Sequence, residues 1–289
     1  MKPDILCIGS VLWDVIGRTP SHMGVGNDVP GRIVRLPGGV ALNIAMTLRQ
    51  FGLRPALLSA VGQDDAGAEL VSRCEAKGLI CNHIYRSEDL PTDVYMAIEG
   101  ANGLVAAIAD AHSLEEAGAR MLRPLSGTLK DWSGPVALDG NLTETLLNDI
   151  ATSDLLAAAD LRIAPASPGK AARLAPFLDG RGTLYVNLEE AGLLTRTNPR
   201  TATEAAAILL DRGAARVLVT DGGRGAADGT PDGIVEASPP AVMVTRVTGA
   251  GDTFMAAHIA SETRGAARED ALAKALDAAA LYVSGETPS

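Results

Sequence analysis

The stretch Val247-Thr248-Gly249-Ala250-Gly251-Asp252-Thr253-Phe254 lies where an extended apolar run, residues 239–247, gives way to a helical pattern. From Asp252 onward the larger side chains recur at helical spacing. Glycines before a helix leave backbone N–H groups free to face an anion, which the helix dipole also favours. Asp252 either complements that dipole or acts as a general base toward the bound group. The stretch therefore predicts a helix start that can house phosphoryl-transfer chemistry.

Two other phosphate-binding motifs are missing from the sequence. No GxGxxG pattern stands between a predicted strand and a predicted helix. Residues 168–171, Pro-Gly-Lys-Ala, lack the first glycine and the Ser/Thr of a P-loop. A dinucleotide-binding fold and a P-loop nucleotidase are both disfavoured.

Composition indicates a large α/β protein. The 289-residue chain is 47% apolar but only 3% aromatic, so its core consists mainly of Ala, Leu, Val and Ile, as expected for a parallel sheet covered by helices. The net charge of -10 and the lack of a Lys/Arg-rich run argue against nucleic acid and anionic membranes as partners. A phosphate-bearing ligand is still compatible, because it needs only local amides and a metal.

Cysteine and histidine usage gives no metal or disulfide pattern. The 3 cysteines form no CxxC pair and the 4 histidines are scattered, so a zinc site and a disulfide framework are poorly supported. The first residues show no signal-peptide pattern, and no stretch reaches the length of apolar sequence needed to span a membrane. We expect a cytoplasmic protein.

Strand and helix patterns alternate along the chain. This alternation predicts a doubly wound, mostly parallel sheet flanked by helices, in a single domain of residues 1–289. The expected strands are residues 4–10, 55–61, 135–138, 161–165, 183–186 and 215–220, and the expected helices are residues 39–51, 66–77, 143–150, 203–212 and those after Asp252.

Two regions interrupt the alternation. Residues 11–36 show no helical pattern, and residues 93–110 read as two strands around a turn at residues 100–103. These two insertions can pair into one small β-sheet that serves as a lid and excludes water from a reaction. The alternative is a hairpin at the edge of the main sheet.

Polar residues beside glycines suggest a sugar site near the N-terminus. Asp14 follows the first strand, and Asn43 follows Gly38 and Gly39. A carboxylate and an amide can bind adjacent hydroxyls while glycines let a ring approach the backbone. The alternative is a tight turn in which Asn43 is an incidental first-turn residue.

Two further clusters follow predicted strands. Asn187 and Glu190 are placed to organise a hydrated Mg²⁺, although Asn followed three residues later by Glu is also a capping-box variant. Thr220, Gly222 and Gly225 can contact the phosphates of a nucleotide, or can simply be a strand followed by a hairpin turn.

In their order and context, these clusters resemble the ribokinase-like family of carbohydrate and nucleoside kinases, also called the phosphofructokinase-B type. The resemblance spans essentially the whole chain and implies an ATP-dependent kinase. It implies that Asp252 is the general base and that Gly249, Ala250 and Gly251 form the anion hole for the transferring phosphoryl group. The remaining roles that it implies are sugar binding by Asp14, Gly38, Gly39 and Asn43, Mg²⁺ and phosphate organisation by Asn187 and Glu190 (the latter through water), an ATP channel at Thr220, Gly222 and Gly225, and a substrate lid formed by about residues 11–36 and 93–110.

Arg246 departs from the family pattern. Many members carry Asp-Thr before Thr-Gly-Ala-Gly-Asp, and in members activated by a monovalent cation that Asp lies beside the ion. A guanidinium there would repel K⁺ and occupy its place. We predict weak or absent activation by K⁺.

The acceptor is less constrained by the sequence. Val247 and residues 106–110, 138–142 and 165–171 are similar to the pseudouridine kinase branch, which phosphorylates the 5′-hydroxyl of a C-nucleoside. In that branch an Asp often stands at the position of Ala164 or Pro165. Ribose, fructose or another hexose, 2-keto-3-deoxygluconate and an ordinary nucleoside stay open as acceptors.

Two other classes of protein fit the sequence less well than a kinase does. A non-catalytic sugar or nucleotide binding protein would have no need of the base at Asp252. A sugar-phosphate hydrolase would need a water-activating residue and a metal cage that the sequence does not offer. The expected partner is a small-molecule sugar or nucleoside, and an exposed edge of the lid could pair with a second subunit to form a homodimer.

Overall fold

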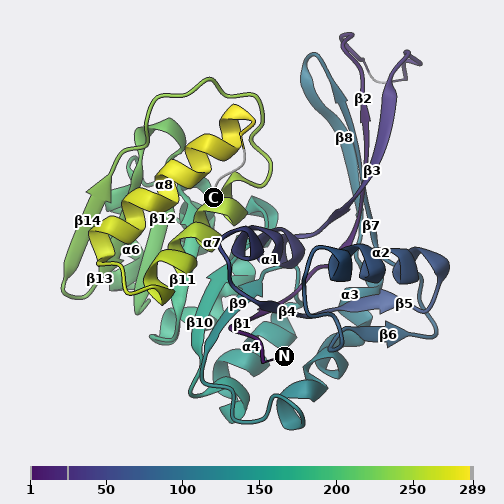
Figure 1. Ribbon diagram of the computed structural model, residues 1–289. Helices are drawn as coiled ribbons and strands as arrows, with labels where there is room; N and C mark the ends of the chain where they lie inside the picture. Colours follow the sequence, from purple (N-terminus) through teal and green to yellow (C-terminus); the bar gives the residue numbers. More distant parts are fainter. Residues whose placement is uncertain (1, 25, 287–289) are drawn as a thin grey trace.

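The computed structural model describes residues 2–24 and 26–286, and within these residues the main sheet has eight strands (Figure 1). The strand order is β14-β13-β12-β11-β10-β9-β1-β4. The six strands from β12 to β4 run parallel, and β13 and β14 add an antiparallel edge. Their bounds are β1 Ile5–Ile8, β4 Pro55–Leu58, β9 Pro135–Asp139, β10 Asp160–Ala164, β11 Thr183–Asn187, β12 Arg216–Thr220, β13 Ala226–Thr230 and β14 Gly233–Ala237.

Helices cover both faces of this sheet. One face packs against α1 (Val40–Gln50), α2 (Asp65–Ala76), α7 (Ala250–Thr263) and α8 (Arg268–Ser284). The other packs against α3 (His112–Ala117), α4 (Glu144–Thr152), α5 (Leu188–Thr195), α6 (Ala202–Asp211) and the 3₁₀ segments η1 (Gly118–Ser126) and η3 (Pro168–Asp179). Neighbouring residues of β1 alternate between the two cores, as the two-residue side-chain period of a strand requires. Burial on both faces explains the nearly continuous apolar strands.

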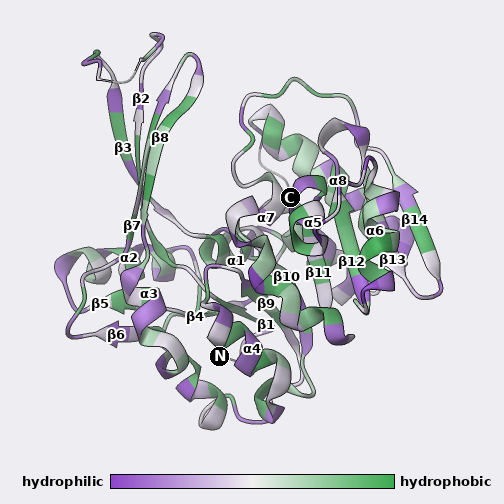
Figure 2. Ribbon diagram, turned by 180° about the vertical axis from the view of Figure 1, so that it is seen from behind, coloured by the Kyte–Doolittle hydropathy of each residue, from purple (hydrophilic) through white to green (hydrophobic). Residues whose placement is uncertain are grey.

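A second, four-stranded sheet projects from the main body, in the order β3-β2-β7-β8 among the described residues (Figure 1). Its strands are β2 Leu12–Arg18, β3 Arg32–Gly38, β7 Val94–Gly100 and β8 Gly103–Asp110. The two insertions that break the alternation therefore pair, through a parallel contact between β2 and β7. Hydrophobic residues lie along β3 and β8 (Figure 2), and those with exposed side chains on this small sheet are Ile33, Val34, Leu36, Met96, Ile98, Leu104 and Ile108.

The predicted fold class is confirmed: the main sheet is doubly wound and mostly parallel, and a small sheet accompanies it. The expected strand at residues 55–61 is interrupted at Ser59 and continues as β5 (Ala60–Gly62), which pairs with β6 (Tyr85–Ser87). Within the part of the chain that the structure describes, no helix is long and apolar enough to cross a bilayer.

The extended run before the glycine stretch is not a strand, and that prediction is wrong. Residues 239–249 form an irregular segment in which Val247 is 70% exposed. Pro239 and Pro240 lack backbone donors directly after β14, so the chain cannot continue a hydrogen-bonded ladder there. The N–H groups of Thr245 and Arg246 instead donate to the Val283 carbonyl near the end of α8. The segment is therefore held at the end of α8 by backbone hydrogen bonds, while its valine side chains are exposed.

Candidate active site

The two polar residues that the sequence places near opposite ends of the chain meet at one hydrogen bond. Asn43, in α1, donates from Nδ2 to Oδ2 of Asp252 at 2.9 Å across a separation of 209 residues. Asp252 lies in the first turn of α7, and α1 and α7 pack side by side on the same face of the sheet (Figure 1). The structure thus brings the predicted base and one predicted sugar ligand into direct contact.

Burial and neighbouring charges raise the proton affinity of Asp252. Burial is the main cause, and it raises the pKa of this carboxyl to about 7. The negative charges of Asp139, Asp14 and Glu190 raise that pKa further, while the hydrogen bond from Asn43 lowers it. A carboxyl with a pKa near neutrality can accept a proton and release it again at ordinary pH, which is the property of an effective general base.

The N-terminus of α7 offers open backbone donors beside this carboxylate. Gly249 is the N-cap residue, with φ +89°, a conformation that favours glycine. The Ala250 N–H donates to the Val247 carbonyl at 3.1 Å, so it is already engaged. The N–H groups of Gly251 and Asp252 have no acceptor among the described residues. Among the helical residues, Gly251 therefore has an open amide, and Asp252 adds a second one. The N–H of the N-cap residue Gly249 also has no acceptor among the described residues.

A tyrosine from α8 supports the glycine turn. Tyr282 donates from its hydroxyl to the Thr248 carbonyl at 2.9 Å. A Cβ on Gly249 would lie 2.5 Å from that hydroxyl oxygen, so only glycine fits against the ring. The Arg246 guanidinium stacks on the ring of Tyr282, with Cζ 3.7 Å from the ring centroid. It also donates from Nε to the Tyr282 carbonyl at 2.7 Å. Arg246 therefore places its charge at the C-terminal end of α8, close to the glycine turn.

Asp14 and the two glycines before α1 also lie together. A Cβ on Gly38 would lie 2.1 Å from Oδ2 of Asp14, so the absence of a side chain makes room for that carboxylate. Burial raises the pKa of Asp14 to about 6. Tyr95 lies directly across from Asp14 on β7, on the same face of the small sheet. Asp14, Gly38 and Asn43 thus border the same region from β2, β3 and α1.

The first three helical amides of α1 are all occupied, whereas in α7 only the first one is. Val40 N–H donates to Ser10 Oγ at 2.9 Å, and Ala41 N–H donates to Asp139 Oδ2 at 3.3 Å. The starts of α1 and α7 are both preceded by glycine and both match the sequence pattern of an anion site. At α1, however, the carboxylate of Asp139 already occupies the position that an anion would take. The open donors at α7 are therefore the ones available to a ligand.

A cleft of about 690 Å³ lies at the ends of β11 and β12. Asn187, Thr220 and Gly222, three of the residues predicted to contact a nucleotide, are in its lining. Gly225 is not part of that lining; it has φ +119° and packs closely on the Ala237 carbonyl. The other lining residues are Leu188, Glu189, Gly192, Leu193, Arg196, Thr197, Asn198, Pro199, Asp221 and Arg224.

Asn187 and Glu190 form the capping box that the sequence left as an alternative. The Asn187 N–H donates to Glu190 Oε2, and the Glu190 N–H donates to Asn187 Oδ1, both at 2.8 Å. Burial raises the pKa of Glu190. Within residues 2–24 and 26–286, no group of three or more His, Cys, Asp and Glu side chains could hold a metal ion. Hydrated Mg²⁺ needs only one or two carboxylates, so Glu190 acting through water fits this donor set.

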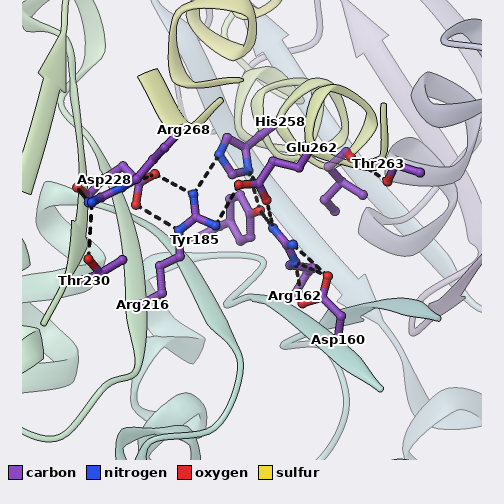
Figure 3. Close-up of polar contacts among 11 residues, drawn as sticks. Asp160, Arg162, Tyr185, Arg216, Asp228, Thr230, His258, Glu262, Thr263 and Arg268 are labelled. Carbon is purple, nitrogen blue, oxygen red and sulfur yellow. Dashed lines mark hydrogen bonds and ion pairs between the residues drawn. The ribbon is translucent and has the colours of Figure 1, made fainter. Parts of the chain in front are cut away.

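The far end of α7 is anchored by a buried ionic cluster (Figure 3). Glu262 accepts from Arg162 at 2.5 Å and from Arg216 at 2.7 Å, and His258 lies one turn earlier on the same helix. Burial lowers the pKa of His258 to about 4, which keeps the ring neutral beside the two guanidinium groups. Because Asp252 lies on the same helix, these contacts fix the helix that carries it.

Comparison with known proteins assigns the family. The model of the pfkB family carbohydrate kinases matches residues 2–288. The chain belongs to this family. Membership makes this pfkB family kinase a phosphotransferase of the sugar and nucleoside kinase type.

The relatives of this pfkB family kinase include proteins with a described substrate. It is 28% identical over 260 residues to the pseudouridine kinase of Escherichia coli K12, with 88% of this chain and 82% of that protein covered. It superposes on a carbohydrate kinase from Agrobacterium tumefaciens with a TM-score of 0.82 and 26% identity, covering 97% and 90% of the two chains. An Arabidopsis thaliana ribokinase complexed with ribose and ATP gives a TM-score of 0.79 at 21% identity, covering 98% and 93%, which shows the shared fold.

Sequence reasoning missed several residues that shape the site of this pfkB family kinase. Asp139 lies within residues 138–142 and Ser10 within the first expected strand, but the sequence assigns neither a role in the site, and it does not distinguish Tyr282 or Tyr95. A signal for Asp139 existed, because an Asp at the end of a buried strand followed by Gly and Asn is unusual in an apolar core. Tyr282 carries no such signal, since it lies within an ordinary helical pattern.

Proposed function

We propose that the protein is an ATP-dependent kinase that phosphorylates a hydroxymethyl group of a sugar or nucleoside, and that its acceptor is pseudouridine, giving pseudouridine 5′-phosphate. The observation that carries the proposal is the contact between Asn43 and Asp252 beside the open amides of α7. This contact supports the proposal because the proposed base, the proposed hydroxyl-binding amide and the open N–H donors lie next to one another. Phosphoryl transfer needs this kind of positioning and charge stabilisation more than covalent chemistry.

In the proposed reaction, Asp252 accepts the proton of the acceptor hydroxyl as that oxygen forms a bond to the γ-phosphorus of ATP. The bond between this phosphorus and the β,γ-bridging oxygen breaks, and ADP leaves with the electron pair. The N–H groups of Gly251 and Asp252 stabilise the negative charge of the transferring phosphoryl group. The acceptor hydroxyls bind Asp14 and Asn43, and the glycines at 38 and 39 let the sugar ring approach the backbone.

The nucleotide is assigned to the cleft at the ends of β11 and β12. Thr220 and Gly222 border it, and Asn187 joins it to the start of α5. Glu190 would hold Mg²⁺ through water. When bound, Mg²⁺ neutralises charge on the phosphates. In this proposal the small sheet acts as a lid, and its residue Asp14 reaches the acceptor.

The choice of pseudouridine is supported by the relative from Escherichia coli that carries this name and covers most of the chain. It is also supported by the face of the small sheet that carries Asp14. Going outward from Asp14 and Tyr95, this face continues with Ile16 and Ala97, which are uncharged and can lie against a flat ring. Ribose, fructose and 2-keto-3-deoxygluconate are the alternative acceptors.

The test is ATP consumption measured against pseudouridine, uridine, adenosine, ribose, fructose and 2-keto-3-deoxygluconate. Pseudouridine is expected to give the highest kcat/KM. Turnover of a different member would replace the acceptor but keep the kinase reaction. If no member is phosphorylated, the acceptor proposal fails.

A homodimer formed through the small sheet is part of the same proposal. The exposed apolar side chains of this sheet and its edge strands β3 and β8 are suited to pairing with a second copy. Sedimentation should give the mass of two chains. Ile108→Lys, at a position 70% exposed on edge strand β8, should give a monomer if the sheet forms the interface.

A further inference from the structure

Asp139, the last residue of β9, is a completely buried carboxylate. Its two oxygens accept five hydrogen bonds of 2.5 to 3.3 Å, from the N–H and Oγ of Ser10, the N–H of Ala41, and the N–H and Nδ2 of Asn141. Lys170 reaches this group only indirectly, by donating to Oδ1 of Asn141. A buried carboxylate this fully bonded has no free lone pair directed at a ligand.

These contacts serve as the missing N-cap of α1. The N-cap residue is Gly39, which has no side chain to accept a hydrogen bond. The first three helical N–H groups donate instead to Ser10 Oγ, Asp139 Oδ2 and the Ser10 carbonyl, at 2.9, 3.3 and 3.3 Å. The cap of α1 is therefore supplied by Asp139 at the end of β9 and by Ser10 after β1, and not by a residue of the helix itself. A negative charge at this position also complements the helix dipole.

Ser10 transmits the position of Asp139 to the turn before α1. Asp139 holds Ser10 by both its N–H and its hydroxyl. Gly39 packs on the Ser10 carbonyl so closely that a Cβ would lie 2.5 Å from the oxygen. Asn43 lies one turn further along α1, and its own N–H donates to the Gly39 carbonyl at 2.8 Å. A shift of Asp139 would therefore move Gly39 and Asn43 together, relative to Asp252 on α7.

We propose that Asp139 is a positioning residue for the acceptor: by capping α1 from another strand, it sets the place of Gly39 and Asn43 against Asp252 without touching the substrate. The inference rests on the proposed function, because that function assigns Gly39 and Asn43 to acceptor binding. The nucleotide cleft at the ends of β11 and β12 contains no residue of this network. Loss of the Asp139 carboxylate should therefore weaken acceptor binding selectively.

The experiment is Asp139→Ala combined with chemical rescue by formate. The variant should raise the KM for the acceptor about tenfold or more and leave the KM for ATP within about twofold, because misplacement of a positioning group affects only the ligand that it orients. Formate can occupy the space of the deleted carboxylate and accept the same hydrogen bonds. Added formate should therefore lower the acceptor KM toward the wild-type value, whereas chloride at the same ionic strength should not.

Asp64 provides a matched control. Its carboxylate also caps a helix, because it accepts from the N–H of Gly67 in α2 at 2.7 Å, and it also holds a distant segment, because it accepts from the N–H of Thr92 at 2.8 Å. Neither Asp64 nor the helix α2 belongs to the assigned site residues. Asp64→Ala should lose stability, as Asp139→Ala does, but its acceptor KM should change by less than about twofold and should not respond to formate.

Equal changes in both KM values, or an acceptor KM that formate leaves unchanged, would overturn the inference and leave Asp139 with a general structural role. Amide hydrogen exchange separates this result from a failure of the proposed function. Residues 40–42 should exchange faster in Asp139→Ala and slow again in formate, whatever the substrate is. If wild-type protein phosphorylates no acceptor, the proposed function fails, and unchanged exchange at these three amides would then refute the capping role as well.

Discussion

Replacing Asn43 by leucine should move the acid limb of the pH profile upward. Asn43→Leu keeps a side chain of similar shape and removes the only side-chain donor to Asp252 among the described residues. That hydrogen bond lowers the pKa of Asp252, which burial raises to about 7. Without the donor, the ionised carboxylate loses a stabilising partner, so the carboxyl should hold its proton to a higher pH.

The size of the shift follows from the strength of the bond. A hydrogen bond to a charged group contributes about 1.5–3 kcal/mol, and 1.36 kcal/mol corresponds to one pKa unit, so the midpoint should rise by about one to two units. At pH 7 the ionised fraction of Asp252 should fall from about one half to between about one tenth and one hundredth. Loss of the Asn43 contact to the acceptor should lower kcat/KM at every pH. Beyond this uniform loss, the rate at pH 7 should fall in the same proportion as the ionised fraction, and this part should recover as the pH rises toward 9.

The assay is kcat/KM for the acceptor between pH 5.5 and 9.5, at saturating ATP and Mg²⁺ and constant ionic strength. Asp14→Asn is the matched control, because it also removes a proposed sugar contact but takes away a negative charge that raises the pKa of Asp252. Its acid limb should move downward. A limb that stays in place in Asn43→Leu, or that moves the same way in both variants, would refute the assignment of Asp252 as the titrating base.

Further outcomes are expected from three other perturbations. Asp252→Asn should lower kcat by about 10²–10⁴-fold with little change in ATP affinity. Because the folded-state pKa of this carboxyl is raised from 3.8 to about 7, its ionisation destabilises the fold increasingly above pH 3.8 and fully above pH 7. The variant should therefore also melt at a higher temperature than the wild type, and the gain should be larger at pH 8 than at pH 5. Glu262→Gln should reduce the free energy of unfolding by about 1.5–3 kcal/mol in urea denaturation, because two largely buried guanidinium groups each lose one of their carboxylate partners and keep the other, Asp160 or Asp228. A loss under about 1 kcal/mol would contradict the importance of this cluster. Replacing choline chloride by KCl should leave the rate nearly unchanged because the Arg246 guanidinium lies at the end of α8, and a steep rise would show that a K⁺ site exists in spite of it.

The fold and the centre of the site could be predicted from the sequence because their signals are local. Each parallel strand is buried on both faces and therefore reads as an apolar run, and each helix between strands shows its own period. The start of α7 was visible for the same reason, since glycines and an acidic residue precede a helical pattern. The contact between Asn43 and Asp252 followed only from the family resemblance, because no local pattern relates two residues so far apart.

The predictions that were wrong or incomplete depend on contacts between distant segments. Residues 239–247 contain β-branched side chains, but whether such a segment pairs as a strand depends on a partner edge, and here the chain packs along the end of α8. The role of Tyr282 likewise depends on which turn its hydroxyl reaches. Neither the segment nor the tyrosine carries that information in its own sequence.

The two glycine-preceded helices show why a glycine motif cannot by itself locate a phosphate site. Gly39 before α1 and Gly249 before α7 both have positive φ angles and both precede helical N–H groups. At α1 those groups are bonded to Ser10 and to the carboxylate of Asp139, whose charge would also repel a phosphate. At α7 the nearby carboxylate is Asp252 itself, which is held by Asn43 and leaves two amides open. The difference between the structural cap at α1 and the proposed catalytic site at α7 therefore lies in a carboxylate contributed by a different strand. Asp139→Ala removes that carboxylate and added formate replaces it, so the pair of measurements tests directly whether this carboxylate is the cap of α1.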